Sequence, residues 1–133
     1  MFCLALLVLA FACKSGDTIR TMQLGEAISL KINESAKLAT NDLLVTFKAV
    51  TSDSRCPQGA QCVWAGEADV VLTVKAGENN QDLTVKVGAG GDNKATLRPY
   101  VIRILKLDPY PVLNQPIQGS DRVIELRVDR TDD

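Results

Sequence analysis

The residues best suited to chemistry in this chain are the two thiols of the segment DSRCPQGAQCVWAGEA, which runs from Asp53 to Ala68. Such a pair of cysteines serves in proteins as metal ligands, as a redox centre or as a structural disulfide. A reactive dithiol usually has two residues between its cysteines, whereas five residues separate Cys56 from Cys62. The spacing therefore disfavours a redox centre and leaves a metal site or a disulfide to be decided.

Carboxylates are the other candidates for catalysis. Glu67 and Asp69 alternate along an expected strand, so both side chains can face one side, as paired carboxylates do in glycoside hydrolases. The polar face of an ordinary sheet has the same pattern, and we favour that interpretation. The segment GAGGDNK lacks the closing Gly-Lys-Ser/Thr of a phosphate-binding loop. We therefore expect no catalytic residues, and a carboxylate-based hydrolase remains an alternative.

The first twelve residues, MFCLALLVLAFA, carry no charge and are followed by Cys13 and a polar segment. This run is shorter than the roughly 20 residues of a membrane-spanning helix but matches the apolar part of a secretory signal. The sequence AFAC, residues 10–13, resembles the lipobox of bacterial lipoproteins. The resemblance implies a signal peptide over residues 1–12, a diacylated Cys13 and a flexible tether over residues 13–21. The alternative is a buried N-terminal element that holds a core cysteine.

These assignments account for all four cysteines. Cys3 is removed with the signal peptide and Cys13 carries lipid, so Cys56 and Cys62 remain to bond to each other. Export places them in an oxidising compartment. A metal ion at this pair would need two further soft or imidazole ligands, and the chain contains no histidine. We therefore predict a Cys56–Cys62 disulfide and expect no metal and no cofactor.

The residues around the predicted disulfide form a candidate binding surface of Asp53, Arg55, Pro57 and Trp64. Asp53 and Arg55 flank the loop, where they are able to pair or to cap backbone amides. Pro57 suits a turn. Trp64 either packs over the disulfide or stands exposed as a platform for a ligand, and we favour packing because a small core gains most from a large ring.

Charge and length exclude some classes of protein. The chain has 133 residues, enough for one domain, and 46% of them are hydrophobic, as in a soluble globular protein. Lys and Arg number 15 against 16 Asp and Glu, so no basic excess is available to neutralise phosphates. We therefore expect no nucleic-acid partner.

From Met22 onward, apolar and polar residues alternate in short segments that are separated by turn residues, which is typical of β-strands. Two facing sheets would bury the apolar positions of these segments. The sequence therefore predicts an all-β fold, a single antiparallel β-sandwich of immunoglobulin-like Greek-key type, with six or seven strands over residues 22–130. The positions expected to face inward are Ile28, Leu30 and Ile32; Leu43, Val45, Phe47 and Ala49; Ala68, Val70, Leu72 and Val74; Leu83, Val85 and Val87; Tyr100, Ile102 and Ile104; and Ile124, Leu126 and Val128.

The pattern DSRCP, a short gap and CVWAG, residues 53–57 and 62–66, resembles a signature of small, uncharacterised exported bacterial proteins rich in β-structure. The resemblance implies an exported β-domain whose cysteines pair, and it implies no activity.

Together these features lead us to expect a cell-envelope lipoprotein, periplasmic or surface-facing and held at the membrane by its lipid anchor. The expected role is a non-catalytic binding or structural module, with an envelope protein or a glycan as its partner. Two alternatives remain. One is a protease-inhibitor-like module that presents the Cys56–Cys62 loop to a partner's cleft, and the other is the carboxylate-based hydrolase.

Overall fold

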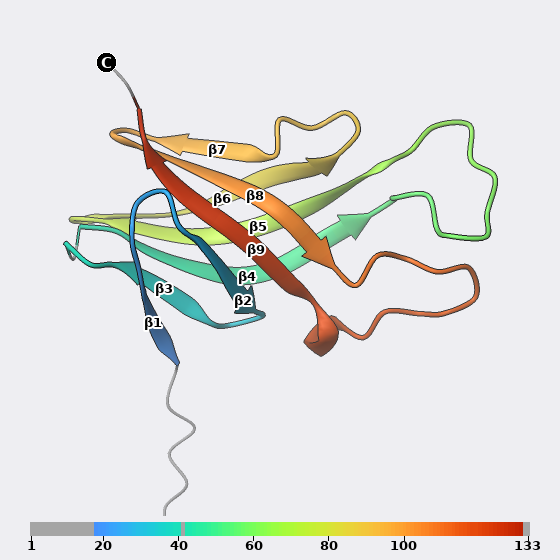
Figure 1. Cartoon of the computed structure of the whole chain (residues 1–133), viewed down its shortest axis with the longest axis horizontal. Coiled ribbons are helices and arrows are strands. Elements are labelled where there is room, and N and C mark those ends of the chain that lie inside the picture. The colour runs from blue at the N-terminus through green and yellow to red at the C-terminus, as the bar shows by residue number, and fades with distance from the viewer. Residues whose placement is uncertain (1–17, 41, 132–133) are drawn as a thin grey trace, which may run out of the picture.

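The computed structural model describes residues 18–40 and 42–131, and these form two facing β-sheets (Figure 1). In spatial order, one sheet contains β1 (Ile19–Met22), β3 (Ser35–Leu38), β4 (Leu44–Asp53), β5 (Glu67–Ala76) and β6 (Asn79–Gly88). The other contains β2 (Ala27–Lys31), β9 (Val123–Arg130), β8 (Tyr100–Asp108) and β7 (Lys94–Leu97). A short 3-10 turn, η1 (Gly119–Asp121), precedes β9. The all-β, sandwich-like architecture predicted from the sequence is thus confirmed.

The described part of the chain has nine strands, whereas the sequence predicted six or seven. The additional ones include β1, β3 and β7, each of only four residues. A strand this short has two positions on each face, too few to produce a recognisable alternation. Because β1 pairs in parallel with β3, the sheet begins at Ile19, inside the segment that was predicted to be a tether.

From β3 onward, most consecutive strands are neighbours in one sheet, whereas β2 lies in the opposite sheet from β1 and β3. Strands β3 to β6 are successive neighbours, β7 to β9 are successive neighbours, and β2 pairs antiparallel with β9. This order differs from that of immunoglobulin domains, whose two sheets have the strand orders ABED and CFG. Tight hairpins join several of the consecutive strands that pair with each other. An example is the turn Gly77-Glu78 between β5 and β6, where Gly77 has the positive φ of +59° that glycine adopts without cost.

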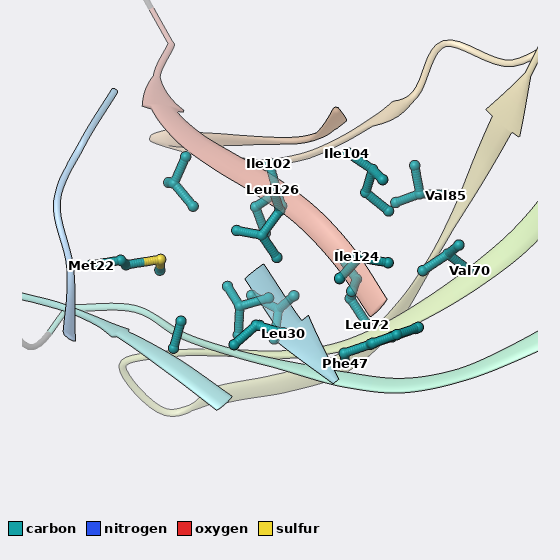
Figure 2. Close-up of a cluster of buried hydrophobic side chains, with 14 of the residues drawn as sticks. Met22, Leu30, Phe47, Val70, Leu72, Val85, Ile102, Ile104, Ile124 and Leu126 are labelled. Atoms are coloured by element: carbon teal, nitrogen blue, oxygen red, sulfur yellow. The ribbon is translucent and has the colours of Figure 1, made fainter. Parts of the chain in front are cut away.

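The core lies between the sheets and is made of alternate residues of both. Figure 2 shows Phe47 and Leu72 of one sheet facing Leu30 and Ile124 of the other. Most of the predicted inward positions of the long strands are confirmed: the buried residues include Val45 and Phe47 of β4, Ala68, Val70, Leu72 and Val74 of β5, Val85 of β6, Ile102 and Ile104 of β8, and Ile124, Leu126 and Val128 of β9. The prediction for Ala49 is wrong, because a register shift in β4 between Phe47 and Ala49 places Val50 against the core instead.

A β-bulge interrupts the alternation in β8. The register between β8 and β9 shifts between Ile104 and Lys106, so Leu105 turns outward and Leu107 returns to the core. Beyond the bulge, β8 ends at Asp108, and the Asp108–Pro109 peptide bond that follows is cis. The chain then enters one of the two loops that form the candidate site.

Candidate functional site

The disulfide loop, residues 54–66, connects β4 to β5 at one end of the sandwich. Cys56 and Cys62 are bonded to each other with their Cα atoms 5.9 Å apart, which confirms the predicted pairing. In the chain-entropy model, closing so short a loop stabilises the fold by about 2 kcal/mol. Gly66 closes the loop with a φ of +72°, and a Cβ atom there would overlap the carbonyl oxygen of Ser54. The two ends of the disulfide loop, at Ser54 and Gly66, therefore lie so close together that only glycine fits at position 66.

The proline loop, residues 109–118, leads from β8 to η1 and lies beside the disulfide loop at the right of Figure 1. The backbone N–H of Gln58 donates to the carbonyl of Pro111 at 2.9 Å, and the N–H of Leu113 donates to the carbonyl of Gln58 at 2.9 Å. These two bonds form a short parallel bridge between loops that start from different sheets. We refer to the two loops together as the loop end.

Arg55 holds the loop end together from beneath. Its Nε and Nη2 donate to the two carboxylate oxygens of Asp53 at 2.9 and 2.8 Å. Its Nη1 donates to the carbonyl of Leu107 at 2.8 Å and its Nη2 to the carbonyl of Pro109 at 3.1 Å. Only 7% of Arg55 is exposed. One guanidinium thus joins the end of β4 in one sheet to the end of β8 in the other.

Tyr110 adds a second connection between the loops. Its hydroxyl donates to the carbonyl of Cys56 at 2.8 Å. The Arg55 guanidinium lies 5.2 Å from the centroid of its ring, a distance suited to a cation–π contact. The tyrosine therefore fixes the disulfide loop from outside while the arginine fixes it from inside.

Asp53 also accepts a hydrogen bond from a second arginine, Arg122. Nη1 of Arg122, just before β9, donates to its Oδ2 at 2.8 Å. Burial by itself would raise the pKa of Asp53, but the hydrogen bonds from Arg55 and Arg122 outweigh burial and lower the pKa to about 2. The predicted pairing of Asp53 with Arg55 is present. Both side chains are nearly buried, so they position the loops rather than offer an exposed surface.

Trp64 stands exposed, with 62% of its surface accessible, so the expectation that its ring packs inward is wrong. Residues 61–65 run outside the sheets, whose interior is already filled by the strands. Val63 beside it is fully exposed, and Pro57 is half-buried. Of the predicted surface residues, Trp64 alone projects well into solvent.

Sequence reasoning missed three residues of the loop end: Tyr110, Leu113 and Arg122. Tyr110 and Leu113 are each 45% exposed, and their only signal in the sequence is the unusual presence of large apolar residues among prolines. Arg122 is 69 residues from the aspartate that it contacts. Nothing in the local sequence around either residue indicates that they meet.

The carboxylates of Glu67 and Asp69 lie on the same face of β5, as alternation requires. Lys86 of β6 lies between them, with Nζ 3.1 Å from Oε1 of Glu67 and 3.0 Å from Oδ1 of Asp69. Hydrogen bonds to Asp69 and then to Glu67 raise the pKa of Lys86. Within residues 18–40 and 42–131, no group of three or more His, Cys, Asp or Glu side chains is arranged to hold a metal ion. The arrangement is that of a polar sheet face.

Two further findings concern the predicted membrane anchor and the similarity to known proteins. The predicted signal peptide and Cys13 lie outside the described residues, and among the described residues there is no helix long and apolar enough to cross a membrane. Comparisons with protein-family models, curated proteins and solved structures find no match to this chain.

Proposed function

We propose that this chain is a non-catalytic binding module of the cell envelope, anchored through lipid on Cys13, which recognises an envelope protein or a glycan with its loop end. The strongest support for the proposal is the location of the large apolar side chains that are exposed. Four of the seven such residues in the described part of the chain are on the two loops: Val63, Trp64, Tyr110 and Leu113. Grouped apolar and aromatic side chains on a surface are typical of binding sites.

The rigidity of the loops also favours binding. Side chains and loops that are ordered before association lose less conformational entropy when a partner arrives. At the loop end the order comes from the disulfide, from the Gln58 bridge and from the four hydrogen bonds of Arg55. Trp64 and Tyr110 are therefore presented on a fixed support.

The geometry disfavours the two alternatives. A hydrolase needs a carboxyl group whose pKa is raised so that it acts as an acid, whereas the pKa of Asp53 is lowered to about 2 and Glu67 and Asp69 share Lys86. An inhibitor loop must offer its backbone to a protease cleft. Here the N–H and carbonyl of Gln58 are already bonded to the proline loop.

Anchoring is tested by replacing the cysteine that is predicted to carry lipid. Cys13→Ala should move the protein from the membrane fraction to the soluble fraction and abolish incorporation of labelled fatty acid. Cys3→Ala, which alters a cysteine in the predicted signal peptide, serves as the matched control and should leave both unchanged. Membrane retention and labelling of Cys13→Ala at the level of the control would contradict the anchor.

Recognition by the loop end is tested in cells with a photo-crosslinking residue at position 63. The control carries the same residue at position 78, in the exposed β5–β6 turn at the opposite end of the strands. We expect a discrete adduct at position 63, none at position 78, and loss of the adduct when Trp64→Ser is added. Equal adducts at both positions, or none at position 63, would exclude the loop end as the binding surface.

A further inference from the structure

A hollow of about 490 Å³ lies between the proline loop, the disulfide loop and the residue before β9. Its volume is within the range of pockets that bind small molecules. Six of its eleven lining residues are apolar: Pro57, Pro111, Val112, Leu113, Pro116 and Ile117. Asn114 and Gln115 add two side-chain amides. A ligand here would therefore meet apolar side chains and polar groups side by side.

The charges in this hollow do not balance. Its ionisable lining residues are Asp53, Arg55 and Arg122, two cations and one anion. Their side chains are only 10%, 6% and 14% exposed. Buried charges in proteins are normally compensated, because a charge that is removed from water without a partner is costly. The hollow thus carries one positive charge in excess.

The excess charge belongs to Arg122. Arg55 directs four of its five N–H groups to Asp53, Leu107 and Pro109. The side chain of Arg122 donates one hydrogen bond within the described residues, from Nη1 to Asp53, and that bond fixes the orientation of its guanidinium. Every deeply buried side-chain nitrogen or oxygen in the described residues has a partner, so the other nitrogens of Arg122 retain contact with solvent. They form an oriented set of donors beside an apolar wall.

We propose that the hollow binds an organic carboxylate that carries an apolar group, with the carboxylate on Arg122 and the apolar group against the proline loop. A planar guanidinium matches a carboxylate in geometry, and a monoanion matches the single excess charge. The proposal rests on the proposed binding function and names the ligand class of its loop end. The same chemistry is offered by the C-terminus of a peptide and by a small free carboxylic acid.

The test titrates the isotope-labelled full chain with three probes and follows the backbone amide signals by NMR. The probes are N-acetyl-leucyl-leucine with a free carboxylate, the same dipeptide as its C-terminal amide, and hexanoate. We expect the free acid to shift the signals of Leu113, Asn114 and Ile117, and the amide to bind at least about tenfold more weakly. Binding of hexanoate as tight as that of the dipeptide acid would indicate a small carboxylic acid, and binding of the dipeptide acid alone a peptide C-terminus.

Substitutions test whether Arg122 provides the positive charge that binds the carboxylate. Arg122→Gln should weaken binding of the best acid at least about tenfold, and Arg122→Lys should restore part of the loss while thermal melting confirms that both are folded. Arg127→Gln, in the strand β9 that begins directly after Arg122, removes an arginine that pairs with Asp129; it is the matched control and should bind like the unchanged chain. Equal binding of acid and amide, no binding up to about 10 mM, or full affinity in Arg122→Gln would overturn the proposal. If one of these results is obtained while cross-linking at position 63 persists, the proposed carboxylate site is wrong but the proposed binding function of the loop end is not contradicted.

Discussion

Two clusters of three charges in this molecule have the same kinds of contact in different surroundings. At the loop end, Asp53 accepts hydrogen bonds from Arg55 and Arg122 at 2.8 to 2.9 Å. On the outer face of β5 and β6, Lys86 contacts Glu67 and Asp69 at 3.0 to 3.1 Å. The side chain of Lys86 is 55% exposed, whereas that of Arg55 is 6% exposed. The clusters thus differ in burial far more than in distance.

The comparison teaches that burial decides what each cluster contributes. An exposed ion pair gains little, because water competes for both charges and two long side chains must be ordered. A buried cluster is different because removing one member leaves another uncompensated in a poorly screening environment. We refer to Asp53, Arg55 and Arg122 as the loop-end cluster, and to Lys86 with its two carboxylates as the Lys86 cluster. We expect the loop-end cluster to affect both the stability of the fold and the geometry of the binding surface, and the Lys86 cluster to affect neither.

The largest expected effect comes from Arg55→Met, which keeps an unbranched apolar side chain in place of the arginine stem and removes the guanidinium. We expect the free energy of unfolding to fall by about 3 to 5 kcal/mol, because Asp53 loses two hydrogen bonds and two carbonyl groups lose their donor. Urea denaturation measures the change. A loss no larger than that of a typical surface substitution would show that burial does not distinguish the two clusters.

Gly66→Ala tests whether the backbone geometry of the disulfide loop is needed to position the cluster of Asp53, Arg55 and Arg122. The added Cβ would overlap the carbonyl oxygen of Ser54, the residue between Asp53 and Arg55, and the backbone there has no flexible atom to move aside. We expect a loss of more than about 2 kcal/mol by thermal or chemical denaturation. Gly119→Ala is the matched control, since a Cβ there meets nothing within 4 Å and its φ is not positive. Similar losses in both variants would mean that the crossing at Gly66 carries no special constraint.

Measuring stability as a function of pH tests the loop-end cluster through Asp53 and leaves Arg55 and Arg122 unchanged. The pKa of Asp53 is lowered from 3.8 to about 2 in the folded protein. Because the folded pKa is depressed, the stabilisation is present above about pH 4 and is lost as the pH falls toward 2. Allowing for solvent screening, we expect a contribution of about 1 to 2 kcal/mol. In Asp53→Asn this part of the pH dependence should disappear, and identical acid curves for the two proteins would contradict the assignment.

The smallest effect is expected for Lys86→Met on the exposed cluster. Water screens the two carboxylates that remain, so the free energy of unfolding should not change measurably at neutral pH. The measurement is the same urea titration as for Arg55→Met. A loss comparable with that variant's would reverse the comparison, because the sheet face would then stabilise the fold as much as the loop end does.

The long strands were predictable because each repeats its pattern. Val70, Leu72 and Val74 alternate with polar or half-buried positions in β5, and burial of one face follows directly from that period. The four-residue strands β1 and β7 are too short to show a period. Strand order was not predictable either, because it depends on which turns are tight enough to keep neighbouring strands in one sheet.

The candidate site was predictable only where it is local. The number of cysteines left after the predicted signal peptide and lipid anchor, with no histidine to complete a metal site, indicated the Cys56–Cys62 disulfide, and the proximity of Asp53 and Arg55 in sequence indicated their pairing. The contact between Asp53 and Arg122 depends on how β4 and β9 lie across the sandwich, which no local pattern encodes. The exposure of Trp64 depends on the path of a loop, which its residue types do not determine.

The position of Arg55 also bears on how the molecule opens. Its guanidinium holds the last residue of β4 and the carbonyls of Leu107 and Pro109, so neither loop can separate without disturbing both sheets. Surface loops usually open by themselves, at a free energy well below that of global unfolding. The amide protons of Cys56 and Gln58 should therefore exchange with solvent only when the whole domain unfolds, and the loop end and the core should behave as one cooperative unit.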